Sequence, residues 1–159
     1  MADDLTSGHG ACNRRHVLRR AAGVLAGGAS GFVLAREALP DIVQPRRAGA
    51  PGFAERAFEM RRLAVERGDQ AYGAVVVKDG RIVGEGVSAV LTTPDPTAHA
   101  EIQALRDAAK RLGTPDLSGC ELYGSSRACP MCEAAAYWAR IARMYHGEAA
   151  TDAGAPRLR

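Results

Sequence analysis

The chain has 159 residues and a formal net charge of +3. The excess positive charge lies in the first 52 residues, which hold seven arginines and four acidic residues. From Phe53 onward, fourteen lysines and arginines are balanced by fourteen acidic residues. Contacts with phosphates supply much of the affinity for nucleic acids, so a protein that binds them is expected to carry a basic face. The neutral main segment argues against nucleic acid as a partner and favours a small molecule.

The first 35 residues resemble an export signal of the twin-arginine type. Arg14 and Arg15 precede an apolar stretch over residues 21–35 that is diluted by four glycines. Fifteen such residues fall short of the roughly twenty that span a membrane as a helix. We predict that residues 1–35 direct export out of the cytoplasm, with a membrane tether if the leader stays uncleaved. The alternative is a basic arm on a cytoplasmic protein.

The next segments predict a linker, a helix and a hairpin. Residues 36–52 contain three prolines and read as a linker. Apolar residues recur at helical spacing over residues 53–67, and Gly68 follows as a stop. Strands are predicted over residues 72–77 and 81–90, because the Asp-Gly turn between them is a strong hairpin signal.

The rest of the chain alternates between predicted helices and strands. They are a helix over 97–112 ended by Gly113, a strand over 119–124, a helix over 130–140, a strand over 141–146 and a tail over 151–159. This order predicts an α/β protein with three α/β/α layers and a mixed sheet. The main domain is predicted over residues 53–150.

One constellation carries the chemistry: His99-Ala100-Glu101, followed about thirty residues later by Cys129-Pro130-Met131-Cys132. An imidazole and two thiolates are ligands that zinc prefers, and three protein ligands leave the fourth position for water. Bound zinc lowers the pKa of water to about 7. A carboxylate two residues from the histidine is then placed to move the proton of that water. The pattern predicts a catalytic zinc site.

The spacing also predicts the local geometry. Two residues apart, His99 and Glu101 do not share a helix face, so they converge only if the site caps the end of their helix. Cys129 and Cys132 are three apart on a helix that Pro130 can open. We therefore predict that two helix N-termini point at one metal, where the helix dipole lowers the pKa of the thiols.

The cysteines and His146 have other possible interpretations. A C-x-x-C pair can be a redox centre or half of a structural zinc ribbon, but the chain holds no second pair to complete a ribbon. Cys120 lies in a predicted strand and is interpreted as a small buried hydrophobic residue. His146 ends another predicted strand and is assigned a structural or exposed position.

Residues 71–140 resemble the cytidine-deaminase-like superfamily, and within it the branch of guanine deaminases and tRNA adenosine deaminases. The matching stretches are residues 72–80, 95–101 and 129–132, and residues 137–140 are closer to the guanine deaminases. The resemblance implies that His99, Cys129 and Cys132 bind Zn²⁺ and that Glu101 is the proton shuttle for attack by zinc-bound hydroxide. The resemblance also implies hydrolytic deamination of a purine base, with guanine as the first candidate substrate. Deamination of a nucleoside or of adenosine in tRNA is the alternative, as is a catalytically decayed zinc-binding relative.

The chain departs from this family near the expected substrate site. Arg127 and Ala128 stand where relatives have glutamate and proline, and Ser88 stands where relatives have an asparagine that binds substrate. The resemblance implies substrate contacts at Ser88, Ala100 and Asp152.

The predicted domain is also short at its C-terminus. Relatives continue past the last zinc ligand with a segment that closes the pocket, whereas 21 residues follow Trp138 here. A small domain whose sheet lacks an edge strand favours self-association, so we predict a homodimer.

Overall fold

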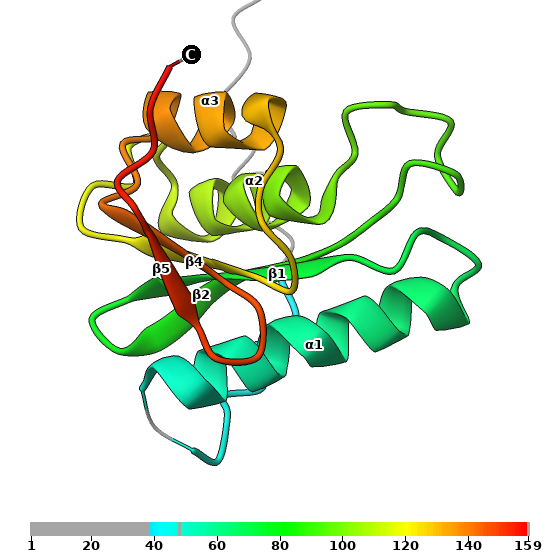
Figure 1. Ribbon diagram of the computed structural model, residues 1–159, viewed down its shortest axis with the longest axis horizontal. Helices are drawn as coiled ribbons and strands as arrows, with labels where there is room; N and C mark the ends of the chain where they lie inside the picture. Colours follow the sequence, from blue (N-terminus) through cyan, green and yellow to red (C-terminus); the bar gives the residue numbers. More distant parts are fainter. Residues whose placement is uncertain (1–38, 48, 159) are drawn as a thin grey trace, which may run out of the picture. The chain divides into compact units, whose positions relative to one another are not determined.

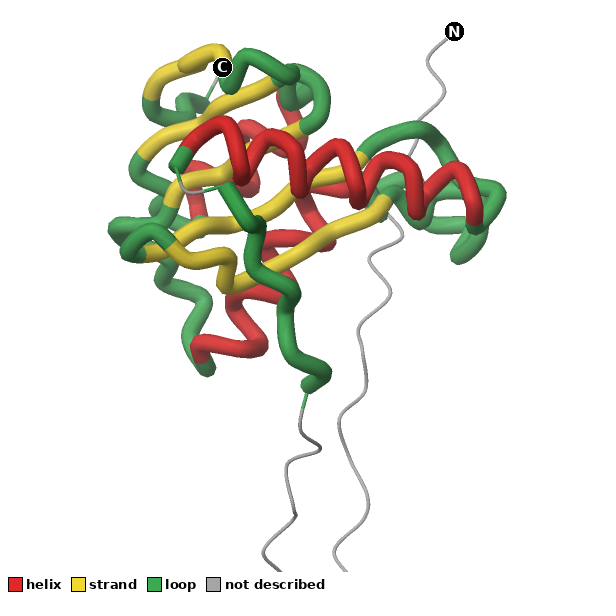
Figure 2. The backbone as a smooth tube through the Cα atoms, turned by 90° about the horizontal axis from the view of Figure 1, so that it is seen from below, coloured by secondary structure: helices red, strands yellow, loops and turns green. Residues whose placement is uncertain are grey.

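The computed structural model describes residues 39–47 and 49–158, so the predicted export signal lies outside the described residues. Five strands form one mixed sheet in the order β2-β1-β3-β4-β5. Figures 1 and 2 show α1 on one face of this sheet and α2 and α3 on the other. The elements are α1 (Ala50–Glu66), β1 (Gly73–Lys78), β2 (Arg81–Val87), α2 (Ala100–Leu112), β3 (Glu121–Gly124), α3 (Pro130–Trp138), β4 (Arg143–His146) and β5 (Thr151–Gly154). The predicted three-layer α/β/α fold is confirmed. Within the described ranges, no helix is both long and apolar enough to cross a membrane.

The predicted hairpin forms the centre of the sheet. Asp79 and Gly80 have φ angles of 49° and 73°, as a two-residue hairpin turn with left-handed residues requires. β1 pairs antiparallel with β2 on one side and with β3 on the other. The residues Val75, Val76 and Val77 of this central strand are therefore almost completely buried.

Helix α2 lies directly on β2 because two glycines leave room for it. A Cβ atom on Gly86 would lie 2.0 Å from the carbonyl oxygen of Ala100, and one on Gly84 would lie 2.6 Å from that of Ala104. Glycine inside a strand often marks such a close approach. The contact holds the first turn of α2 against the sheet, and the site described below begins at that turn.

The other face of the sheet packs on α1 through an aromatic row. The Tyr123 ring stacks on Tyr145 at a centroid distance of 4.6 Å and meets Phe53 at 5.3 Å. The helix begins at Ala50, inside the segment predicted as a linker, because a proline is favourable in the first turn of a helix. Part of that segment also docks on the sheet. The amide of Gln44 bonds both backbone groups of Ile82 on the open edge of β2.

The C-terminal residues form a strand that sequence analysis treated as a tail. β3 and β4 are parallel and joined through α3, and β5 then returns antiparallel along β4. β5 has four residues, most of them exposed, so it lacks the alternation of apolar and polar residues that identifies a strand in a sequence. The carboxyl ends of β3 and β4 consequently meet at one edge of the sheet.

Candidate active site

Two helix N-termini converge at this edge of the sheet. His99 is the N-cap residue of α2 and Cys129 is the N-cap residue of α3, both in extended conformation. The expected meeting of two helix starts is confirmed. Helix α2 begins three residues later than predicted, because Asp95 accepts hydrogen bonds from the backbone N–H and the hydroxyl of Thr97. Such side-chain bonds compete with helix formation.

Three potential ligand atoms lie together at this point. The sulfurs of Cys129 and Cys132 are 3.6 Å apart, and Nδ1 of His99 lies 3.7 and 3.6 Å from them. In a tetrahedral zinc site, ligand atoms bonded at about 2.3 Å for sulfur and about 2.0–2.1 Å for nitrogen are separated by about 3.5–3.8 Å. The separations and the chemical types of the three atoms therefore fit zinc.

Glu101 lies next to this ligand group without belonging to it. Its side chain is buried in the first turn of α2, and the thiol of Cys132 donates to its Oε2 over 3.6 Å. Burial raises the pKa of the Glu101 carboxyl above its ordinary value, while its own backbone N–H and the Cys132 thiol act in the opposite direction.

The expected lowering of the thiol pKa is wrong for Cys132. Burial raises the pKa of this thiol, and the negative carboxylate of Glu101 raises it further. Desolvation at a fully buried position outweighs the helix dipole. A bound cation would favour the thiolate form of Cys132.

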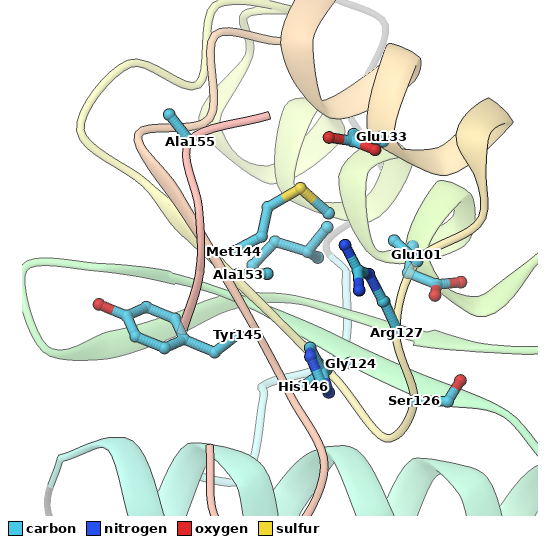
Figure 3. Close-up of a pocket in the computed structure, with 12 residues that line it drawn as sticks. Glu101, Gly124, Ser126, Arg127, Glu133, Met144, Tyr145, His146, Ala153 and Ala155 are labelled. Atoms are coloured by element: carbon cyan, nitrogen blue, oxygen red, sulfur yellow. The ribbon is translucent and has the colours of Figure 1, made fainter. Parts of the chain in front are cut away.

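A cavity opens beside Glu101 at the carboxyl ends of β3 and β4 (Figure 3). Ligands of open α/β sheets characteristically bind outside the carboxyl ends of strands. Polar side chains line the cavity together with residues that follow β4. The cavity residues used below are Arg127, Glu133, Met144, His146, Ala153 and Ala155.

The sequence motif, the paired helix starts and the ligand distances agree with the outcome of a comparison with protein families. Residues 51–148 match the family described as the cytidine and deoxycytidylate deaminase zinc-binding region. The chain belongs to this family. As a zinc-binding deaminase domain, it carries its possible metal site in His99, Cys129 and Cys132.

Relatives of this deaminase domain include enzymes for free bases and for tRNA. The guanine deaminase of Bacillus subtilis is 51% identical over 82 residues, which cover 52% of this chain and 53% of that protein. The solved structure of a guanine deaminase from this species superposes with a TM-score of 0.58 at 45% identity, over 62% of this chain and 66% of that one. The tRNA-specific adenosine deaminase of Aquifex aeolicus is 38% identical over 96 residues, or 60% of this chain and 64% of that protein.

A further solved neighbour was crystallised in complex with 2,6-diaminopurine. It is 28% identical and has a TM-score of 0.60, over 63% of this chain and 57% of that one. The deaminase domain described here spans between about half and two thirds of the length of these relatives.

Ser88, predicted to contact substrate, is instead bonded inside the protein. Its side chain is almost completely buried, and its hydroxyl donates to the carboxylate of Asp69 over 2.7 Å. The same carboxylate accepts bonds from the backbone N–H groups of Leu91 and Thr92 and from the Thr92 hydroxyl, at 2.8 to 2.9 Å. Ser88 is absent from the residues that line the cavity. Asp69, which sequence analysis did not single out, thus ties together the loop that leads from β2 toward the site.

The two other predicted substrate contacts lie in different places. Ala100 is the first residue of α2, so its backbone N–H has no acceptor inside the helix. Asp152 pairs directly with Tyr145 on β4, and directly paired residues point to the same face of a sheet. That face is the one covered by α1, opposite Glu101, and there Asp152 forms an ion pair with Arg143 at 3.3 Å. The structure does not bring Asp152 into the cavity.

Sequence analysis missed two polar side chains of the cavity. His146 was assigned a structural or exposed position, and Arg127 was noted only as a departure from the family. In the structure both face the cavity beside Glu101 (Figure 3). Their positions in the sequence could have indicated a place at the site. His146 ends β4, and Arg127 lies between the end of β3 and Cys129.

We expect Asp69→Asn to destabilise the protein and to loosen residues 88–93. Burial acts to raise the pKa of Asp69, but the bonds from Thr92 and Ser88 outweigh it and hold the pKa below its usual range. A carboxylate with a lowered pKa in the folded state contributes stability above its unfolded pKa of about 3.9, and this contribution is lost as the pH falls below that value. The difference in unfolding midpoint between wild type and variant should therefore be largest near pH 7 and shrink toward pH 3. An equal difference at both pH values would contradict an ionised Asp69.

Proposed function

We propose that the chain is a zinc-dependent hydrolytic deaminase of a purine base, with guanine as the first candidate. One observation carries this proposal: the buried carboxylate of Glu101 lies between a three-atom ligand group and a cavity at the carboxyl ends of two strands. The choice of a purine is supported by the 51% identity to a guanine deaminase and by the diaminopurine complex of a structural neighbour.

The roles of the residues follow from their placement. His99, Cys129 and Cys132 would hold the zinc ion, which as a Lewis acid lowers the pKa of water to about 7. Glu101 accepts the proton of the attacking water and passes it to a ring nitrogen as the C–O bond forms. It then delivers a proton to the exocyclic amine as the C–N bond breaks. Ammonia leaves and a carbonyl group replaces the amine.

Deamination of adenosine in tRNA is the second candidate, and the 38% identity to a tRNA-specific adenosine deaminase favours it. Two features count against it. The chain from Phe53 onward carries no net charge, and two of the cavity side chains are the carboxylates of Glu101 and Glu133. Neither feature suits a polyanion. The proposal is therefore for a small heterocycle.

Ammonia release from a panel of substrates tests the proposal. Zinc-loaded protein should release ammonia from guanine faster than from adenine, adenosine, cytosine or cytidine. Faster release from adenosine, or from the adenosine of a tRNA anticodon arm, would favour the second candidate. Protein with full zinc content that releases ammonia from none of them would point to a decayed relative that binds without turnover.

We also propose that residues 1–35 direct export by a twin-arginine route. This route carries folded proteins, so zinc can be bound before the protein crosses the membrane. Replacing Arg14 and Arg15 together by lysine should leave the protein in the cytoplasm. Cell fractionation measures this, and unchanged localisation of the double variant would contradict the proposal.

A homodimer is our proposal for the assembly. Two adjacent aromatic residues at the end of α3, Tyr137 and Trp138, are exposed, Trp138 to 72%. Exposed aromatic residues are common at protein interfaces. Light scattering after size-exclusion chromatography should give twice the chain mass, and Trp138→Ala should reduce it. A monomeric wild type at tens of micromolar would exclude a stable dimer.

A further inference from the structure

Arg127, an exposed residue that lines the cavity, carries a guanidinium group for which the described part of the chain provides no partner. Arg127 lines the cavity, and Figure 3 shows its side chain between Glu101 and Met144. Among the described residues, Arg127 makes no ion pair or hydrogen bond. The arginines at positions 56, 106, 111, 140 and 143 each pair with a carboxylate. Arg127 is thus a donor group at the site whose hydrogen bonds are available to a ligand.

The backbone of Arg127 is held in place from both sides. Two residues before Arg127, the backbone N–H of Ser125 donates to the carbonyl of Gly73, and the Ser125 hydroxyl accepts from the N–H of Gly73. Two residues after Arg127, Cys129 belongs to the candidate ligand group. The guanidinium is therefore carried on a short segment between two anchored points. A guanidinium group held in this way can discriminate between substrates by the positions of their hydrogen-bond acceptors as well as by their charge.

The charged side chains around Arg127 indicate which kind of hydrogen-bond acceptor on a ligand this residue would bind. Two carboxylates, Glu101 and Glu133, line the same cavity. The carboxylate of Glu101 would repel a phosphate dianion, whereas a neutral ring that presents two adjacent acceptors would not be repelled. Arginine forms paired hydrogen bonds with O6 and N7 of guanine, while adenine offers N7 and a donor amine at the same edge.

Resting on the proposed function, we propose that Arg127 is a specificity-determining residue that donates two hydrogen bonds to the O6 and N7 edge of an oxopurine. It selects guanine over purines without the 6-oxo group. Glu101 acts at the amine on the other side of the same ring. Arg127 takes no part in the proton transfers.

Binding in an inactive background tests this selection directly. Glu101→Gln protein loaded with zinc is compared with the same protein carrying Arg127→Gln or Arg127→Lys. 2-Aminopurine, which lacks O6 and is fluorescent, reports its own binding, and guanine is measured by displacing it. The matched control is Arg62→Gln, because Arg62 is exposed on α1 at the other face of the sheet.

We expect Arg127→Gln to lower the preference for guanine over 2-aminopurine by roughly 5-fold to 150-fold, the range for a paired arginine–guanine contact. Arg127→Lys should lose most of the preference, because lysine keeps the charge but not the fork of donors. The Arg62 variant should keep the wild-type preference. An Arg127 variant with an unchanged preference, or one that weakens both purines equally, would overturn the inference. So would Arg127-dependent binding of GMP that is tighter than that of guanine.

The two proposals fail separately in this design. If the active protein releases ammonia from guanine but the preference does not depend on Arg127, the specificity assignment is wrong and the deaminase assignment stands. If no base is deaminated but the preference falls in the Arg127 variants, the cavity binds oxopurines without turnover.

Discussion

Glu101→Gln is expected to reduce turnover by at least about 10² to 10⁴ while the protein keeps its zinc. Glutamine has almost the same size as glutamate but cannot take up and release a proton at pH 7. In the proposed reaction that carboxylate serves both the attacking water and the departing amine, so the loss should reach the upper part of the range. Steady-state ammonia release gives the rate, and elemental analysis gives the zinc content per chain.

The matched control for this variant is Glu66→Gln. Glu66 is an exposed residue at the end of α1, on the face of the sheet away from the site, so its replacement should change neither quantity. Zinc lost from the Glu101 variant would show that Glu101 is a ligand. Turnover retained in that variant would exclude it as the proton shuttle.

Cys132→Ser is expected to abolish stoichiometric zinc binding and to lower stability. Cys132 is completely buried and belongs to the candidate ligand group, so the variant would lose one proposed ligand and place a hydroxyl there. Binding to the folded state alone stabilises a protein by about 2.7 kcal/mol at a free ligand concentration one hundred times its dissociation constant. The wild-type melting temperature should therefore fall on adding a chelator, and that of the variant should not.

Cys120→Ser provides the matched control. Cys120 is also completely buried but lies outside the ligand group, so its replacement should cost stability without loss of zinc. Cys129→Ser should behave as Cys132→Ser does, with a smaller direct effect on packing because Cys129 is only half-buried. One zinc per chain in both ligand variants would contradict the assignment of the cysteines.

The residues of the chemistry could be found in the sequence because their signals are local. His99 and Glu101 are two apart, and the two ligand cysteines are three apart, so helix geometry alone limits how each pair can be placed. The Asp79-Gly80 turn and the glycine that ends α2 are likewise properties of a few neighbouring residues. The same short patterns predicted that two helix N-termini lie at one site, and the structure confirms this.

The surroundings of the site depend on contacts between distant parts of the chain. Ser88 is tied to Asp69, nineteen positions away, and no local pattern reveals that a buried carboxylate takes its hydroxyl. The resemblance implied a substrate contact at Asp152, but the register of β5 against β4 turns this residue to the opposite face of the sheet. A shift of one residue in a strand reverses every side chain, so such a position is decided only by strand pairing.

The sequence by itself determined the candidate ligand group, the acidic residue beside it and the layered fold, because motif spacing and hydrophobic periodicity encode them over short distances. Only the tertiary structure decided what else faces the cavity. Arg127 and His146 meet there because β3 and β4 are parallel neighbours whose carboxyl ends coincide, although the two residues are 19 positions apart in the chain. Parallel pairing across an intervening helix is set by packing on both faces of the sheet, and no segment read alone contains it.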